Sequence, residues 1–286
     1  MELHEASCGY WSETGQSGCT EEGLAENLVM LDDADAVRTL TLNDPGRLNA
    51  LSESLITGLA AAFADTAEDA SVRVVVLRGA GRAFCAGHDL REMTAARMAE
   101  DGGRAHFAAQ FERTSRLMLS IPRLPQPVIA EVHGIATAAG CQLAASCDLV
   151  IAAEGTRFGV NGVDVGLFCS TPMVALTRVM GRKRTFELLV TGEFVEAEEA
   201  RALGLVNRVV PAEALGAATR ALAATIAGKL GPALRIGKRA FYDQAELPVD
   251  QAYELAGKVM AENMMLDETA EGISAFLEKR RPGWQA

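Results

Sequence analysis

Residues 72–77 read Val-Arg-Val-Val-Val-Leu, and this nearly continuous apolar stretch determines the class of fold. A strand with one solvated face alternates apolar and polar side chains. A strand that is apolar on both sides is covered on both faces, as in a parallel sheet between layers of helices. Two further strands are predicted at 128–132 and 149–152. The sequence therefore predicts a sheet buried inside the protein.

Helical segments alternate with these strands. Ser52 is a candidate N-cap for a helix whose apolar residues recur at helical spacing. A second helix is predicted from about 103 to 120, and a helix of small residues at 137–145. The first two strands are predicted at 28–31 and 37–42, around a turn at 32–35. Such alternation is typical of an α/β fold.

The composition and the hydrophobic periodicity of the chain change twice, and these changes predict its domains. Residues 1–27 are polar, rich in Gly and Ser and without apolar periodicity, so we predict an N-terminal tail. Residues 28–210 hold the alternating strands and helices, with a last short strand at 205–209, and are predicted to be the core. Residues 211–286 show long helical patterns, which predict a helical C-terminal region.

Charge and composition exclude several classes of partner. The 286 residues include 27 Lys and Arg against 38 Asp and Glu, a formal net charge of −11. Nucleic acids and anionic membranes are bound by basic surfaces, so we expect neither as a partner. No apolar run approaches the roughly 20 residues that cross a bilayer, and the N-terminus lacks the apolar stretch of a secretory signal. These features place the protein in a cytoplasm or matrix, and we predict a cytoplasmic location.

The six cysteines predict neither disulfides nor a metal site. A chain of this length does not need disulfides for stability, so we expect reduced thiols. Cys85 and His88 form a C-x-x-H pattern, and Cys141 and Cys147 follow, but the spacing matches no zinc module. Small buried apolar side chains are the simpler interpretation.

Small residues beyond the predicted strands form the candidate functional loops. Gly79-Ala80-Gly81 begins like a dinucleotide-binding fingerprint, but Phe84 occupies the place of the third small residue, so we reject nicotinamide binding. In two other segments, 82–90 and 134–144, backbone N–H groups can approach a ligand without obstruction. Two such groups on one carbonyl oxygen form an oxyanion hole. From the residues alone, simple tight turns remain an equal alternative.

Four ordered motifs carry a resemblance to a known family. They are Ala-Phe-Cys-Ala-Gly-His-Asp-Leu at 83–90, Pro-Val-Ile-Ala-Glu-Val-His-Gly at 127–134, Gly-Cys-Gln-Leu-Ala-Ala-Ser-Cys-Asp at 140–148, and Leu-Val-Thr-Gly-Glu at 189–193. In order and spacing they resemble the enoyl-CoA hydratase/isomerase (crotonase) family, and 272–280 looks like that family's C-terminal helix. The resemblance implies an α/β fold with a spiral core of ββα turns and a C-terminal helical trimerisation region. It also implies a homotrimer or hexamer that binds acyl-CoA, with coenzyme A as part of the substrate and no separate cofactor.

The same resemblance assigns roles to individual residues. The oxyanion-hole amides would be those of His88 and Ala139. Arg91 matches a position that contacts coenzyme A, and Phe276 and Lys279 match positions that reach the coenzyme A of a neighbouring subunit. A few such cations are enough to hold phosphates on an acidic protein.

The sequence departs from the family pattern at both catalytic acids. The family's hydratases add water with two glutamates, whose positions are occupied here by Gln142 and Gly162. An amide exchanges no proton at neutral pH and glycine has no side chain, so hydration should be badly impaired. The aspartate that serves other members would fall near Ser170. The carbonyl-polarising amides do not depend on side chains and would survive.

Three functions follow from this resemblance. The primary prediction is an enoyl-CoA hydratase-type enzyme of fatty-acid or related metabolism that stabilises a thioester enolate. One alternative is decarboxylation of a malonyl-type thioester, in which loss of CO₂ forms the enolate without a base and the His88 side chain orients the carboxylate or delivers a proton. The other is an acyl-CoA-binding protein that has lost its acids. His133 and Asp164 are given structural roles, and Asp89 is expected to cap a helix.

Overall fold

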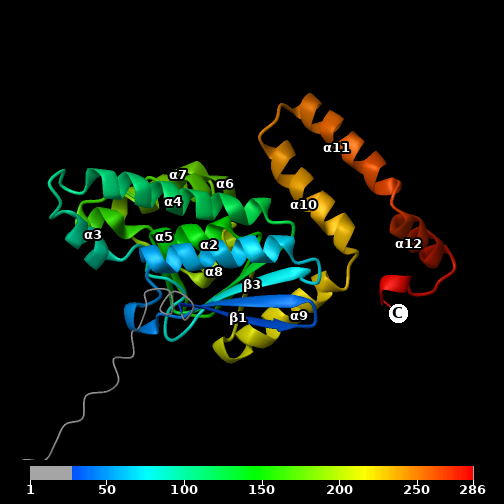
Figure 1. Ribbon diagram of the computed structural model, residues 1–286, viewed down its shortest axis with the longest axis horizontal. Helices are drawn as coiled ribbons and strands as arrows, with labels where there is room; N and C mark the ends of the chain where they lie inside the picture. Colours follow the sequence, from blue (N-terminus) through cyan, green and yellow to red (C-terminus); the bar gives the residue numbers. More distant parts are fainter. Residues whose placement is uncertain (1–27, 286) are drawn as a thin grey trace, which may run out of the picture.

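A computed structural model describes residues 28–285 of the chain (Figure 1). The predicted polar tail at 1–27 lies outside the described residues. The main body contains the sheets with the helices around them, and the last helices extend away from this body to one side (Figure 1). No helix within residues 28–285 combines the length and apolar character that would let it cross a membrane.

Six strands form the main sheet, in the order β1-β2-β3-β4-β6-β9. The first pair is antiparallel and all later neighbours are parallel. The hairpin between the first two strands turns at Asp35 and Ala36, with φ of 51° and 61°, so the predicted turn at 32–35 began too early. The strands are β1 (Val29–Ala34), β2 (Val37–Leu42), β3 (Val74–Gly79), β4 (Val128–Val132), β6 (Leu149–Ala153) and β9 (Arg208–Val210).

A second, smaller sheet accompanies the first. Its strands are β5 (Ile135–Thr137), β7 (Arg157–Gly159) and β8 (Phe194–Glu196). Two isolated parallel bridges, Leu51 with His88 and Cys85 with Ala136, continue this layer toward earlier parts of the chain. The chain therefore passes repeatedly from the main sheet to the smaller layer, through a helix, and back, which gives the predicted spiral of ββα turns.

Helices cover both faces of the main sheet. The larger apolar core packs α2 and α4 against the sheet, and Ser52 caps α2 as expected, accepting a bond from the Leu55 amide at 3.2 Å. On the other face α9 packs over Val74, Val76 and Ile129. The strand predicted at 72–77 is thus buried from both sides. The helices of the body are α2 (Glu53–Glu68), α3 (Leu90–Ala96), α4 (Arg104–Arg123), α5 (Ala139–Ser146), α6 (Pro172–Val179), α7 (Arg182–Thr191), α8 (Ala197–Ala202) and α9 (Leu215–Ala227).

The last three helices form an arm: α10 (Gly231–Ala245), α11 (Val249–Met264) and α12 (Asp267–Leu277) (Figure 1). None of the residues of α11 is buried, and Ala275 is the only one buried in α12. The first helix docks on the body through a buried ion pair, in which Lys238 Nζ lies 2.6 Å from Asp148 Oδ2. Tyr242 donates to the other oxygen of Asp148 at 2.7 Å.

Candidate active site

A cavity of about 310 Å³ lies where the two candidate loops meet. Its wall is mostly apolar and contains residues of the first loop (86, 88 and 90), the second loop (137–139) and the segment after β7 (161, 162, 165 and 167–172). Met93 of α3 and Phe111 of α4 complete it. Within the described part of the chain, no Asp or Glu belongs to this wall.

Backbone pairing fixes the first loop. The Asn49 side chain donates to the carbonyls of Ala80 and Ala83 at 2.9 and 2.8 Å and so anchors the start of the loop. Further along, the backbone of Leu51 makes hydrogen bonds to the residues before and after His88. Leu51 N donates to Gly87 O at 2.7 Å, and Leu51 O accepts from Asp89 N at 3.4 Å. In a parallel bridge of this kind, the amide of the middle residue points away from the partner strand.

The second loop presents the start of α5. Ala138, the residue before the helix, has φ 50° and ψ −120°, an unusual backbone conformation for a residue with a side chain. The first helical bond runs from Gln142 N to Ala138 O at 3.0 Å. The amide of Ala139 precedes that bond and belongs to the N–H groups that a helix leaves unpaired at its start. Throughout residues 28–285, nothing accepts a hydrogen bond from the amides of His88 or Ala139.

Gly87 brings the two loops together. It has φ +89°, and a Cβ built on it would lie 3.0 Å from Thr137 O and 3.3 Å from Ala139 N. A side chain is therefore excluded at this position by both conformation and space. The residue that follows, His88, lines the same cavity as Ala139. The arrangement gives one cavity two backbone amides from two separate loops.

The His88 imidazole lies at the cavity wall. Its ring meets Phe111 edge-on, with centroids 5.5 Å apart and planes at 80°. Each ring nitrogen exposes less than 1 Å² and has no hydrogen-bond partner. Burial lowers the pKa of His88, while the Leu51 carbonyl, outside hydrogen-bond geometry, acts in the opposite direction. The ring is therefore neutral at neutral pH, with one donor and one acceptor unused.

The two positions at which the family resemblance expects catalytic acids differ in their surroundings. Gln142 is 4% exposed, its Oε1 has no partner, and it does not line the cavity. Gly162 does line the cavity, but the space beside it is filled. A Cβ built there would lie 2.1 Å from Leu167 O and 2.8 Å from Cys169 Sγ. The backbone that follows Gly162 therefore occupies the place that a side chain would need.

The predicted coenzyme A contacts lie outside this cavity. Arg91 is exposed on α3, whose first turn is capped by Asp89, as predicted, through a 2.8 Å bond from Arg91 N. Phe276 and Lys279 are exposed at the end of the arm. None of these three side chains lines the cavity of its own chain.

The other predicted residues have mainly structural surroundings. His133 Nε2 lies 2.8 Å from Gly81 O, a bond between two loops. Asp164 accepts a long bond of 3.4 Å from Asn161 Nδ2 and does not line the cavity, whereas Ser170 does. Asn161 was not predicted as a site residue, but it lines the cavity. Its Oδ1 accepts a hydrogen bond of 2.6 Å from Oγ1 of Thr137, which also lines the cavity.

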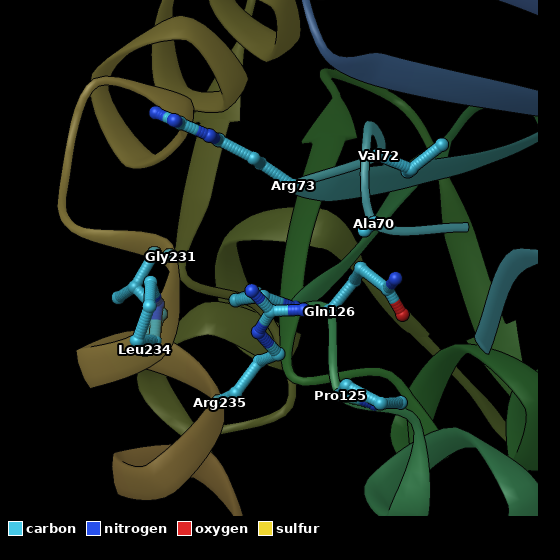
Figure 2. A pocket seen from close by; sticks show the side chains of 10 residues that line it. Ala70, Val72, Arg73, Pro125, Gln126, Gly231, Leu234 and Arg235 are labelled. Atoms are coloured by element: carbon cyan, nitrogen blue, oxygen red, sulfur yellow. The ribbon is translucent and has the colours of Figure 1, made fainter. Parts of the chain in front are cut away.

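A second, smaller cavity of about 80 Å³ lies between the start of β3 and the start of α10 (Figure 2). Arg73 and Arg235 border it, together with Gln126. Arg73 donates to Ala227 O at 2.9 Å and thereby bonds the last turn of α9. No predicted site residue lines this cavity, so the larger one is the candidate active site.

Comparison with known proteins agrees with this fold. The sequence pattern of the enoyl-CoA hydratase/isomerase family matches residues 32–286. The chain belongs to this family, and the predicted α/β spiral is confirmed. An enoyl-CoA hydratase from Mycobacterium smegmatis is 53% identical, with a TM-score of 0.86 over 91% of this chain and 99% of that one.

Several relatives share one particular name. The mouse protein named enoyl-CoA hydratase domain-containing protein 3, mitochondrial, is 40% identical over 278 residues, 97% of this chain and 91% of the mouse chain. The human protein of that name is 41% identical over 250 residues, covering 87% and 81% of the two chains. In the sequence, the segments 137–147 and 166–172 are the ones that indicate this group. These relatives are named mitochondrial, which contradicts the predicted cytoplasmic location.

Proposed function

We propose that the protein acts on acyl-CoA thioesters and stabilises a thioester enolate with the backbone amides of His88 and Ala139. One observation carries this proposal: two amides without acceptors belong to the wall of one apolar cavity. As negative charge develops on the thioester oxygen, fixed N–H donors in a site of low polarity lower the barrier. The start of α5 adds a positive partial charge at the same place.

Ordinary hydration is not the reaction that this cavity favours. Adding water to an enoyl thioester needs a group that takes a proton from the water and one that delivers a proton to carbon. Within the described chain the cavity wall holds no carboxylate, and Gly162 has no room for one. We therefore expect slow hydration and favour reactions that need only the enolate.

Decarboxylation of a malonyl-type thioester is the second candidate. The bond between the α-carbon and the carboxylate breaks, CO₂ leaves, and the electron pair becomes the enolate. A partly buried neutral imidazole with two unpartnered nitrogens favours this candidate, because His88 could hydrogen-bond the carboxylate and supply a proton to the carbon. The remaining alternative, an acyl-CoA-binding protein without turnover, shares the same cavity.

Three assays on the full chain separate these functions. Crotonyl-CoA is the hydration substrate, and CO₂ release is measured from methylmalonyl-CoA and ethylmalonyl-CoA. We expect turnover only with the malonyl-type thioesters. Binding of butyryl-CoA without turnover of any substrate would instead identify a binding protein, and crotonyl-CoA hydration at about 1–10³ s⁻¹ would refute the proposal.

The Ala139→Pro variant tests the amide directly. Proline removes the N–H at the first position of α5, where proline is tolerated in helices, and should lower turnover by about 10²–10³. Urea unfolding of the variant shows whether the fold is kept. Turnover unchanged in a folded variant would contradict a role for this amide.

We further propose that the arm joins this chain to other copies in a homotrimer or hexamer. The support is an arm whose middle helix buries no residue within its own chain. In such an assembly Phe276 and Lys279, exposed on one chain, would contact the coenzyme A bound to a neighbour, and Arg91 would contact the coenzyme A of its own chain.

A further inference from the structure

Asn161 supplies the one side-chain amide that residues 28–285 bring to the wall of the acyl cavity. It is the first residue of the short 3-10 helix Asn161–Val165, and the next residue is Gly162. Position 162 has no room for a side chain, so Asn161 provides the polar side chain at this point of the wall. The proposed reaction gives this amide no role so far.

Two neighbours fix which way round the Asn161 amide lies. Thr137 Oγ1 donates to Asn161 Oδ1 at 2.6 Å, and Asn161 Nδ2 donates to Asp164 Oδ2 at 3.4 Å. Turning the amide over would bring its oxygen against the Asp164 carboxylate, and neither of these oxygens carries a hydrogen to donate. The amide oxygen is therefore occupied by Thr137, and the amide nitrogen is the end that remains for a ligand.

The amide nitrogen of Asn161 has donor capacity to spare. It carries two hydrogens, and its one partner in the described part of the chain, Asp164, is bound at a long distance. Asp164 is itself exposed, so water competes for its carboxylate and screens its charge. Asn161 therefore has an N–H group available for a ligand in the cavity that it lines.

This donor belongs to the same part of the cavity as the proposed backbone amides. Thr137, which holds Asn161, comes shortly before Ala139 in the second loop. A Cβ built on Gly87 would lie 3.0 Å from Thr137 O and 3.3 Å from Ala139 N, so the carbonyl of Thr137 and the amide of Ala139 lie side by side. The α-carbon of a thioester is bonded to the carbonyl carbon, so a group on the α-carbon stays close to whatever holds the carbonyl oxygen.

We propose that Asn161 is a specificity-determining residue whose amide nitrogen donates a hydrogen bond to the α-carboxylate of a malonyl-type thioester, with Thr137 as the positioning residue that holds this amide. The inference rests on the proposed function, since the two backbone amides must hold the thioester oxygen. A neutral amide suits this task, because a cation would stabilise the carboxylate charge that decarboxylation has to remove. The His88 imidazole then has only to supply the proton that the enolate needs.

Asn161→Leu in the full chain tests the recognition of the carboxylate, because leucine has nearly the same shape and lacks both N–H groups. CO₂ release from methylmalonyl-CoA gives KM and kcat, and calorimetry gives Kd for butyryl-CoA, which has no carboxylate. KM for methylmalonyl-CoA should rise about 10- to 100-fold, the effect of losing one hydrogen bond to a charged group. The value of kcat should not fall, because the carboxylate loses its charge as CO₂ forms. Kd for butyryl-CoA should stay within about twofold.

Thr137→Val and Thr137→Ser form a matched pair, since only serine keeps the hydroxyl that holds the Asn161 oxygen. Thr137→Val should raise KM for methylmalonyl-CoA about three- to tenfold, and Thr137→Ser should restore it to within about twofold of the original value. A merely structural role of Thr137 would instead weaken the binding of butyryl-CoA to the same extent. Equal KM values in the two variants would overturn the positioning role.

The two thioesters also separate failure of this inference from failure of the proposed function. An unchanged KM for methylmalonyl-CoA in Asn161→Leu overturns the role of Asn161, as does an equal loss of affinity for both thioesters. If methylmalonyl-CoA binds without CO₂ release, its Kd from calorimetry replaces KM in the same comparison. An original chain that binds butyryl-CoA but not methylmalonyl-CoA overturns carboxylate recognition alone. An original chain that binds neither thioester overturns the proposed function as well.

Discussion

Backbone amides carry the proposed chemistry, so the identity of the side chains at 88 and 139 does not define it. What defines it is the conformation of the residues beside them, Gly87 with φ +89° and Ala138 with φ 50°. Side chains at Gln142 and Gly162 can therefore differ from those of a hydratase while the amides keep their places. Under the proposed function, this fold retains the groups that activate a carbonyl without the groups that add water.

Gly162 offers a direct test of the packed loop behind it. Gly162→Ala places a Cβ against Leu167 O and Cys169 Sγ, so we expect a loss of about 2–3 kcal/mol in the free energy of unfolding. Gly181→Ala is the matched control, because no atom lies within 4 Å of a Cβ at that position, and it should change stability by less than about 0.5 kcal/mol. Urea unfolding measures both. Equal free energies of unfolding for the two variants would show that the loop at 167–169 shifts without cost to make room for the Cβ.

Because position 162 has no room for a side chain, placing an acid at position 142 alone should not restore hydration. We expect Gln142→Glu to leave crotonyl-CoA hydration near its original rate, because Gln142 does not line the cavity and position 162 has no room for a second acid. The hydration rate of the purified variant checks this. A gain of about 10²-fold or more would show that a single acid is sufficient.

The partly buried imidazole of His88 predicts a specific pH dependence of stability. Its pKa is lowered in the folded chain from the ordinary value of 6.5, so the unfolded chain takes up this proton first as pH falls. Stability should drop as the pH falls below 6.5 and the drop should level off below the folded pKa. His88→Phe should lose less stability than the original chain between about pH 7.5 and about pH 5 in urea unfolding. His133→Gln is the control, and an unchanged pH dependence in His88→Phe would contradict the assignment.

The sequence motifs predicted that His88, Ala139 and Gly162 belong to one site, and the structure places all three on one cavity wall. Their motifs are local, so chain order is sufficient to find them. Phe111 could not be predicted in the same way. Helical periodicity shows that 103–120 has a buried face, but it does not show which loop that face meets. The filling of position 162 depends on the path of 167–169, which no local pattern encodes.

At the scale of elements, α10 is fixed to the body by a buried ion pair. The side chains of Lys238 and Asp148 are 7% and 14% exposed, and Lys238 also donates to Ile121 O and Gln126 O. Removing one partner leaves a buried charge unpaired, so Lys238→Met should cost about 3–5 kcal/mol in the free energy of unfolding.

Lys258→Met is the matched control for this pair. Lys258 pairs with Glu254 on the surface of α11, with both side chains more than half exposed, and such pairs contribute about 0–1 kcal/mol. Urea unfolding compares the two variants. A cost below about 1 kcal/mol for Lys238→Met would mean that the buried pair does not hold the arm.

Element prediction succeeded for the strands of the main sheet, including the short β9 predicted at 205–209, and failed for the short strands of the second sheet. The strand predicted at 72–77 was found two residues later, as β3 at Val74–Gly79, and the long arm helices were predicted, since longer runs give a clearer pattern. The strands β5, β7 and β8 have three residues each and show no period, so the smaller sheet was missed. The helix predicted from 137 begins at Ala139, because Ala138 adopts a positive φ.

At the scale of the whole molecule, the arm predicts assembly. Tyr253 and Met260 on α11 are 77% and 64% exposed, and charged residues there should prevent burial against another chain. We expect light scattering of the original protein to give a multiple of the 30.3 kDa chain mass. The Tyr253→Glu/Met260→Glu variant should give the mass of one chain.

Met98→Glu is the control for that experiment, since Met98 is 86% exposed beyond α3 and lies outside the arm. It should leave the mass unchanged. An original protein that already has the mass of one chain would contradict assembly through the arm.

The two edges of the main sheet have a consequence for how a newly made chain behaves. An open sheet edge offers unpaired N–H and C=O groups to any extended peptide and so seeds aggregation. Here β1 carries exposed Asp32 and Asp33 on one edge, and β9 ends the other after three residues. Charge on one side and brevity on the other discourage fibril growth, so a newly made chain does not recruit neighbours strand by strand.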